Sequence, residues 1–237
     1  MFEEIEQKLR DGAEISMAEV EALRAHRDRL DDIQDQVDGQ RLGVSSTDFA
    51  LRSRSSAGFA IVVGHTLNRP GAMAAAPISQ AEYTWNKDLA GKIKALCDVK
   101  AIESRIFYRD GIGISGAYRQ VADWGAAMVV ELHFNAFNTQ AHGTETLYDN
   151  DRNAESKAWA QRLQDGMLAA LSLRDRGLKE RDPGDRGYSS VSAIDIPSAL
   201  IEPFFGDNPT EAHVAEAKKD DLAEAVAEAA AVQLTGV

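Results

Sequence analysis

Apolar and amphipathic segments alternate along the chain from Phe59 onwards. The apolar segments have the length of buried strands, and the longer segments between them have helical spacing. The predicted strands are residues 59–65, 104–110, 127–134, 143–149 and 198–205, and the predicted helices are residues 78–97, 115–126, 153–172 and 209–234. This alternation predicts an α/β fold, in which a mostly parallel mixed sheet is flanked by helices on both faces.

The first 58 residues follow a different pattern. Ser16 and Glu19 have capping-box spacing at the start of a long charged helix. Apolar residues recur every seven positions along it, at Leu23, Leu30 and Val37. This thin seam fits either a coiled-coil homodimer or a helix that packs on the main domain. We assign residues 1–40 to an N-terminal helical arm, residues 41–58 to a Ser-, Gly- and Arg-rich linker, and residues 59–237 to the main domain.

The net charge and the cysteine content exclude several classes of partner and of site. The net charge of −12 argues against nucleic acid or an anionic membrane surface as the main partner, because neither attracts an acidic chain. The single cysteine, Cys97, excludes an intramolecular disulfide and a multi-cysteine metal site, and we expect it to be a buried core thiol. The acidic N-terminus does not resemble a secretory signal, and no segment approaches the ~20 apolar residues of a membrane span. We therefore expect synthesis in the cytoplasm.

Three predicted strands end in a residue that could do chemistry: His65, His133 and Glu202. A single histidine at a strand end is more often a hydrogen-bonded loop residue than a ligand. A buried carboxylate is costly unless it is paired, hydrogen-bonded or bound to metal. The carboxyl ends of parallel strands form binding sites in α/β sheets. A shared position in one pocket therefore explains the three residues better than three unrelated local roles do.

Glu82 is a fourth candidate with two interpretations. Ser79 and Glu82 have capping-box spacing, so the carboxylate could serve only the N-terminus of its helix. Glu82 also shares one side of that helix with Trp85 and Leu89, which define the buried side. A carboxylate turned inward on the first turn would lie near His65. The spacing alone leaves the cap and the ligand equally open.

These four residues together suit metal-assisted hydrolysis. Two histidines and one carboxylate form a familiar catalytic zinc set, which leaves the fourth tetrahedral position to water. An additional glutamate can deprotonate that water while zinc polarises the scissile carbonyl. The donor types favour zinc over harder cations. Of the other histidines, His142 is a weaker candidate in the loop after the His133 strand, and we expect His213 on the surface.

The main domain resembles the zinc-dependent N-acetylmuramoyl-L-alanine amidases of the amidase-3 type over about residues 59–235. The matching motifs, in order, are VVGH, SQAEYTWNKDLAGKI, LHFNA, GTETLY, RGLK and SALIEPFFGDNP. The resemblance implies that His65, Glu82 and His133 hold one Zn²⁺ per chain and that Glu202 is the catalytic acid/base. It implies peptidoglycan as substrate, cleaved between the lactyl group of N-acetylmuramic acid and L-alanine of the stem peptide. The protein would then act on the cell wall.

The chain departs from the usual family pattern in several places. Glu131 stands where the family strand has a small residue, so it is a candidate to support the metal ligands, or simply a partner for a neighbouring arginine or lysine. The loop after His65 is apolar instead of glycine-rich and acidic. The EPFF ending and the N-terminus look like those of phage lysins of this family. We expect Asn135 and Glu145 to line the substrate groove.

Two rival functions remain at this stage. The first is a zinc carboxypeptidase-like hydrolase that acts on stem peptides or other peptides. The second is a non-catalytic, zinc-containing module that binds the cell wall. Glu202 argues against the binding module, because a structural zinc site has no need for an additional glutamate.

Overall fold

The computed structural model describes residues 2–11, 13, 15, 16, 19, 58–149 and 151–235. The strands are β1 Gly58–Val63, β2 Ser104–Tyr108, β3 Ala126–Leu132, β4 Thr144–Tyr148, β5 Asp175–Glu180 and β6 Ser198–Glu202. The helices are α1 Phe2–Arg10, α3 Glu82–Val99, α4 Gly113–Trp124, α5 Ser156–Leu171, α6 Tyr188–Val191, α7 Pro209–Ala217 and α8 Lys219–Thr235.

The strands form a six-stranded sheet in the order β2-β1-β3-β6-β4-β5. Neighbouring strands from β2 to β6 pair in parallel, whereas β4 runs antiparallel to β6 and β5 follows the direction of β4. The sheet is therefore mixed, with most pairings parallel. The carboxyl ends of β1, β3 and β6 meet at one edge, which is the edge where the candidate residues stand.

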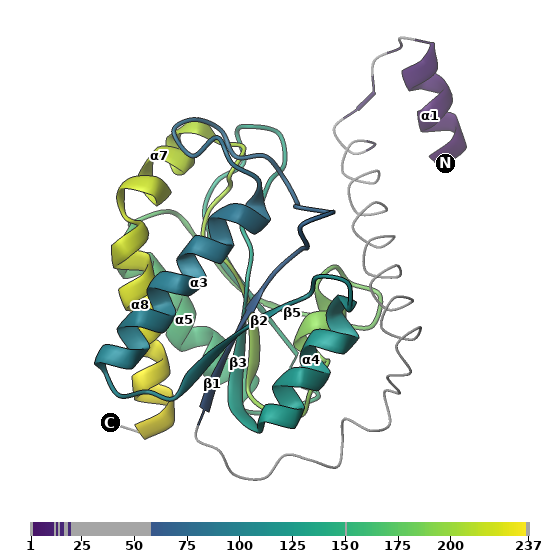
Figure 1. Cartoon of the computed structure of the whole chain (residues 1–237). Coiled ribbons are helices and arrows are strands. Elements are labelled where there is room, and N and C mark those ends of the chain that lie inside the picture. The colour runs from purple at the N-terminus through teal and green to yellow at the C-terminus, as the bar shows by residue number, and fades with distance from the viewer. Residues whose placement is uncertain are drawn as a thin grey trace.

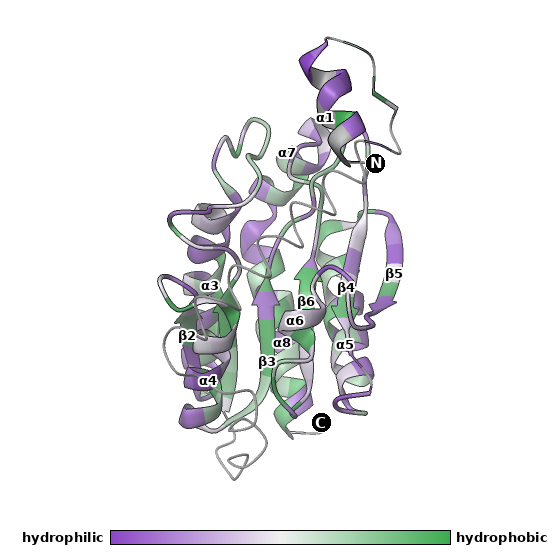
Figure 2. Ribbon diagram, turned by 90° about the vertical axis from the view of Figure 1, so that its right-hand side faces the viewer, coloured by the Kyte–Doolittle hydropathy of each residue, from purple (hydrophilic) through white to green (hydrophobic). Residues whose placement is uncertain are grey.

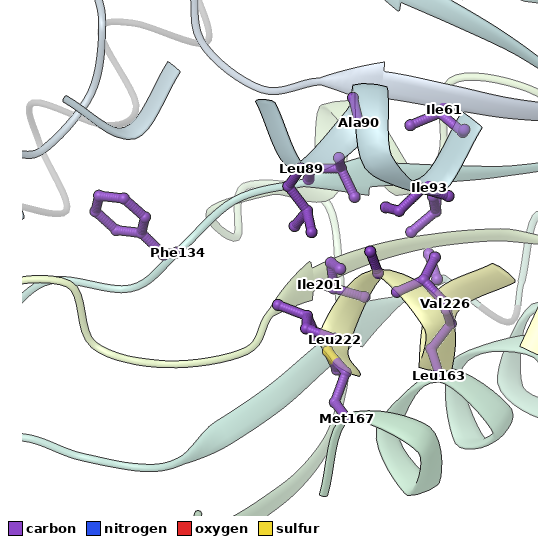
Figure 3. Packing of buried hydrophobic residues seen from close by; sticks show 14 of the residues in the cluster. Ile61, Leu89, Ala90, Ile93, Phe134, Leu163, Met167, Ile201, Leu222 and Val226 are labelled. Atoms are coloured by element: carbon purple, nitrogen blue, oxygen red, sulfur yellow. The ribbon is translucent and has the colours of Figure 1, made fainter. Parts of the chain in front are cut away.

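Helices cover both faces of the sheet, as the alternating pattern predicted (Figure 1). Helices α3, α5 and α8 pack on one face, and α4 and the short α6 lie on the other. The larger apolar cluster lies on the α3/α5/α8 face, where Ile61, Ile93, Leu163, Ile201 and Val226 meet between sheet and helices (Figure 3). Burial of such side chains contributes roughly 1.5–3 kcal/mol each to folding. This cluster packs α3, α5 and α8 against the sheet that carries the candidate residues.

The residues of strand β3 alternate between the two faces of the sheet. Met128, Val130 and Leu132 join the larger cluster, whereas Val129 joins the smaller cluster under α4. Because side chains alternate along a strand, Glu131 points to the α4 face with Val129. In Figure 2 the central strands are mostly hydrophobic, with a hydrophilic segment toward the end of β3. The α4/α6 face therefore becomes polar as the strands reach their carboxyl ends.

Several sequence predictions need correction in detail. Strand β5 was not predicted, because its residues are half-buried or exposed and mostly polar, so it carries no apolar signal. Figure 2 shows β5 as largely hydrophilic. The closing helix predicted over residues 209–234 is two helices, which are separated at Lys218. Cys97 is fully buried in the larger cluster, as predicted.

The N-terminal region is described only in part. The backbone N–H of Ser16 donates to the Glu19 carboxylate at 2.8 Å, and the Glu19 backbone N–H donates to the Ser16 hydroxyl at 3.3 Å, so the predicted capping box forms. The heptad residues and almost all of the 41–58 linker lie outside the described residues. Among the helices that are described, none has the length and apolar content needed to cross a membrane.

Candidate active site

The three residues expected to bind metal lie together at the carboxyl edge of the sheet. His65 follows β1, Glu82 is the first residue of α3, and His133 follows β3. Ligand atoms of the three residues all lie within 4.8 Å of one another. Nε2 of His65 is 3.2 Å from Oε2 of Glu82, and Nδ1 of His133 is 2.9 Å from Oε1 of the same carboxylate. Glu82 thus links the two imidazoles, and three segments distant in sequence form one cluster.

Two glycines let the chain approach this cluster closely. A Cβ atom on Gly64 would come within 2.3 Å of Nε2 of His133. A Cβ atom on Gly71 would come within 2.7 Å of Oε2 of Glu82, and Gly71 has a positive φ of 79°. His65 itself has a φ of 63°, a left-handed conformation that few non-glycine residues adopt. Such strain persists where surrounding structure enforces it, and it is concentrated at functional sites.

The cap interpretation of Glu82 is wrong. Helix α3 begins at Glu82, its N-cap is Ala81, and no side chain caps it. Ser79 lies before the helix with a φ of 48°. The Glu82 carboxylate turns away from its own helix and accepts hydrogen bonds from the backbone N–H groups of Ala72 and Phe134, at 3.3 and 3.0 Å. These bonds fix both oxygens in position for the two imidazoles.

The charges in this cluster support one another. Burial raises the pKa of Glu82, but the charge of His65 and the hydrogen bond from His133 outweigh it and hold this pKa below its usual range. Burial lowers the pKa of His133, but hydrogen bonds to Glu131 and Glu82 outweigh it and raise the pKa to about 9. The carboxylates are therefore ionised at neutral pH, as metal ligands must be.

Glu131 is completely buried and every oxygen has a partner. Its Oε1 accepts from Nη1 of Arg109 at 2.8 Å and lies 3.0 Å from Nε2 of His133. Its Oε2 accepts from the Tyr118 hydroxyl at 2.9 Å. Burial raises the pKa of Glu131, but the Arg109 charge and the His133 contact lower it to about 2. The expected arginine partner is present, and the same carboxylate also holds a candidate metal ligand.

Glu202 ends β6 beside His133. The backbone N–H of His133 donates to the carbonyl of Ile201 at 3.1 Å, which places Glu202 on the neighbouring strand. Glu202 is buried, its Oε1 accepts from Nη2 of Arg186, and its Oε2 has no hydrogen-bond partner within the described part of the chain. Burial raises the pKa of Glu202, Arg186 opposes this rise, and Glu145 adds to it. A carboxylate with an unbonded oxygen and a raised pKa suits proton transfer.

Asn135 and Glu145 form a second polar group next to Glu202. Glu145 lies directly opposite Glu202 in the antiparallel register of β4 and β6. Asn135 Nδ2 donates to Oε1 of Glu145 at 2.8 Å, and Nε of Arg176 donates to Oε2 at 2.7 Å. The Arg176 guanidinium also stacks on the Phe205 ring, 5.0 Å from its centroid. Both carboxylate oxygens of Glu145 are therefore engaged within the protein.

The sequence did not identify every residue of this region. Arg109 and Tyr118 were missed, although Arg109 directly follows β2 at the same sheet edge and could have been found by that position. Arg186 follows β5, which itself carries no apolar signal, so no pattern pointed to it. His142 is exposed and belongs to no metal-ligand cluster among the described residues, and His213 is exposed as expected.

The donor set fits zinc. Catalytic zinc sites use imidazole nitrogens and a carboxylate oxygen at about 2.0–2.2 Å, so ligand atoms lie roughly 3.3–3.5 Å apart. The spacings of 3.2 and 2.9 Å between the Glu82 oxygens and the imidazole nitrogens are close to this separation. Of the three candidate ligands, His65 has the most exposed side chain, at 26%, against 5% for Glu82 and 12% for His133. His65, Glu82 and His133 could therefore hold one ion together.

Comparisons with known proteins point to one group. A family model described as N-acetylmuramoyl-L-alanine amidase matches residues 60–232. The catalytic domain of CwlV, an N-acetylmuramoyl-L-alanine amidase from Bacillus (Paenibacillus) polymyxa var. colistinus, has a TM-score of 0.65 at 22% identity, over 76% of this chain and 98% of that chain. The N-acetylmuramoyl-L-alanine amidase from Clostridium difficile 630 has a TM-score of 0.62 at 25% identity, over 76% and 98%.

A relative by sequence is the N-acetylmuramoyl-L-alanine amidase LytC of Bacillus subtilis (strain 168). It is 32% identical over 89 residues, which are 37% of this chain and 17% of LytC. This chain spans less than half the length of the curated relatives it matches.

Proposed function

The chain belongs to the N-acetylmuramoyl-L-alanine amidase family, and we propose that it cleaves peptidoglycan with one bound zinc ion. The bond cut is the amide between N-acetylmuramic acid and L-alanine of the stem peptide. The observation that carries the proposal is the pairing of two unlike carboxylates at one sheet edge. Glu82 contacts both imidazoles, and Glu202 next to them has one oxygen without a hydrogen-bond partner among the described residues. A metal-dependent hydrolase needs both ligands for the metal and a base.

Each residue has a defined task in this mechanism. His65, Glu82 and His133 would hold the ion, which supplies an activated water and polarises the scissile carbonyl when bound. Oε2 of Glu202 accepts the proton from the attacking water, because that oxygen is not engaged elsewhere in the described chain. Glu202 then donates this proton to the nitrogen of the leaving L-alanine, so the amine departs neutral.

The roles of Asn135 and Glu145 follow from their contacts. The carbonyl oxygen and N–H of Asn135 bond to Gly206 and Phe204, so its backbone is fixed beside β6. Glu145 engages the Asn135 amide and the Arg176 guanidinium. We propose that Asn135 contacts the substrate. Glu145 contributes to substrate binding chiefly because it orients Asn135 and Arg176. Glu131, buried behind His133, supports the metal ligands from within.

Mass analysis of muropeptides tests the proposed function. Purified cell walls are digested with the protein, with and without a chelator. The expected products are intact glycan strands and stem peptides with a new N-terminal alanine, and the chelator should abolish their release. Stem peptides shortened from the carboxyl end would instead support the carboxypeptidase-like hydrolase. Binding to walls with no release of amine at any zinc concentration would support the non-catalytic wall-binding module.

Two further proposals concern the context of the enzyme. The EPFF ending of the motif around Glu202 supports a bacteriolytic, endolysin-like enzyme. Turbidity of intact cells and of permeabilised cells, each treated with added protein, tests this use.

We also propose a homodimer through the heptad seam at Leu23, Leu30 and Val37. Sedimentation of the full chain and of a chain that starts at residue 58 tests the seam, and a dimer that persists without the arm would exclude it.

A further inference from the structure

We propose that Glu131, held by Arg109 and Tyr118, is a positioning residue that fixes which nitrogen of His133 binds the metal. On this proposal Nδ1 of His133 faces the ion, and Nε2 carries a proton donated to Glu131. The inference rests on the proposed function only in taking zinc as the ion. It assigns a role to three buried residues, of which Arg109 and Tyr118 were not identified from the sequence.

The two nitrogens of the His133 ring face different carboxylates. Nδ1 lies 2.9 Å from Oε1 of Glu82, and Nε2 lies 3.0 Å from Oε1 of Glu131. Only Glu82 also approaches His65, at 3.2 Å. An ion that contacts both His65 and Glu82 must therefore lie on the Nδ1 side of the His133 ring.

The Nε2 side of the ring has no room for an ion. Gly64 packs so closely there that a Cβ atom would lie 2.3 Å from Nε2 and 2.4 Å from Cε1 of His133. The carbonyl oxygen of Leu132 would lie 2.6 Å from that Cβ atom. Backbone on one side and the Glu131 carboxylate on the other occupy the space around Nε2.

Glu131 is unsuited to be a ligand itself. Its Oε1 is shared between Arg109 and His133, its Oε2 accepts from Tyr118, and its side chain is completely buried. It does not belong to the group formed by His65, Glu82 and His133. Arg109, also buried, balances its charge, so the pair can remain ionised inside the protein.

The arrangement solves a chemical problem for His133. A neutral imidazole carries its proton on either nitrogen, and only the nitrogen without the proton can bind metal. A carboxylate that accepts from Nε2–H fixes the proton there, orients the ring and increases the basicity of Nδ1. Tyr118 and Arg109 in turn prevent Glu131 from rotating, because they hold both of its oxygens. The orientation of the ring is thereby set before the ion arrives.

Zinc competition with a chromophoric chelator tests this role. Glu131→Gln should weaken Zn²⁺ binding by about 10–100-fold, as is typical for the partner of a ligating histidine. Tyr118→Phe, which removes one hydrogen bond and keeps the ring, should weaken it several-fold. Two matched controls should leave zinc affinity unchanged. Glu211→Gln alters a buried glutamate that accepts from the N–H groups of Gly143 and Phe205, and Tyr148→Phe removes a hydroxyl that donates to Glu180.

Spectra of the zinc-loaded wild type test directly which nitrogen of His133 binds the ion. Long-range ¹H–¹⁵N spectra of ¹⁵N-histidine protein, with His133 assigned by substitution, should show Nδ1 bound to zinc and Nε2 protonated. Zinc on Nε2, zinc coordinated by Glu131, or an unchanged affinity in Glu131→Gln would overturn the inference. If Glu131→Gln does not fold, Tyr118→Phe and the wild-type spectrum decide. Zinc bound through Nδ1 without release of amine from cell walls would overturn the proposed function alone.

Discussion

The two sides of the candidate site treat their carboxylates in opposite ways. On the metal side, Glu82 bonds two backbone N–H groups and two imidazoles, and its pKa lies below the usual range. On the other side, Glu202 has one oxygen without a partner in the described chain, and burial raises its pKa. A metal ligand must stay charged and fixed, whereas a base must be able to take a proton and release it. The surroundings of each carboxylate match one of these needs.

Removal of the base should have the largest effect. Glu202→Gln keeps the shape of the side chain but cannot accept a proton, so amide hydrolysis should fall by about 10²–10⁴-fold. Zinc content should stay at one ion per chain, because Glu202 is not among the predicted ligands. Release of N-terminal alanine from cell walls and metal analysis of the same sample measure both. A Glu202→Gln protein with the wild-type rate would end the distinction between the two sides.

Substitution of Glu82, the proposed ligand, should weaken zinc binding instead of proton transfer. Glu82→Gln keeps a hydrogen-bonding group but loses the charge, and zinc affinity should fall by more than about 10²-fold, because each ligand contributes several kcal/mol. Activity should return in part when zinc is added in excess.

Glu211→Gln is a close control for this change. Glu211 also lies in the first turn of a helix, is buried, and accepts from two backbone N–H groups, but it does not belong to the group formed by His65, Glu82 and His133. Glu211→Gln makes the same chemical change, the loss of one carboxylate charge and of one hydrogen-bond acceptor, away from the proposed ligands, so the zinc affinity should stay unchanged. Equal loss of zinc in the two variants would mean that Glu82 acts only through the packing of its loops.

The same contrast shows what the sequence could and could not predict. The strand ends at His65, His133 and Glu202 were predictable, because apolar strands stop there and polar residues follow. The choice between cap and ligand for Glu82 was not, since a capping box and an inward ligand share the same spacing. The helix start at residue 82 excludes the cap, and the ligand role of Glu82 stays a prediction. The resemblance to amidases supplied the ligand assignment before any geometry was known.

Contacts that join distant segments were beyond the sequence. Glu131 stood out as a carboxylate on a core strand, but nothing in the sequence linked it to Arg109 at the end of β2 and Tyr118 in α4. Arg186 follows β5, whose polar residues gave no strand signal. These pairings depend on sheet order, which a single sequence does not contain. Polar networks between elements are therefore the part of the site that only the structure reveals.

The metal side should make the stability of the metal-free protein depend on pH. His133 has a folded-state pKa of about 9, above its ordinary value of 6.5, because Glu131 and Glu82 outweigh the effect of burial. Protonation thus favours the folded state, and this stabilisation is fully present below about pH 6.5 and is lost as pH rises through about 9. The free energy of unfolding should fall by about 1–3 kcal/mol over this window.

Urea unfolding of chelator-treated protein at several pH values measures this loss. His133→Asn should remove most of the dependence, because no group remains there to titrate. Zinc-loaded protein should show less of it, since zinc takes the place of the proton on the ring. An unchanged slope in His133→Asn would assign the dependence to other groups.

The base side offers a smaller test. Arg186 lies against Glu202 and lowers its pKa, although burial raises it overall. Arg186→Gln removes that positive charge, so the pKa of Glu202 should rise. Glu202 must be ionised to accept a proton, and the acid limb of the kcat/KM profile should therefore move to higher pH. The shift should be below about one pH unit, because 41% of the Arg186 side chain is exposed and water screens its charge.

The Arg186→Lys variant separates charge from shape in this test. A lysine keeps the positive charge, so its acid limb should stay closer to that of the wild type than the limb of Arg186→Gln does. Rates well above the acid limb should differ little among the three proteins, because Glu202 is ionised in all of them. An acid limb that moves to lower pH in Arg186→Gln would show that Arg186 does not stabilise the charged form of Glu202. The pKa of Glu202 would then be set by burial and by the charges of Glu145, His133 and Glu82, without a contribution from Arg186.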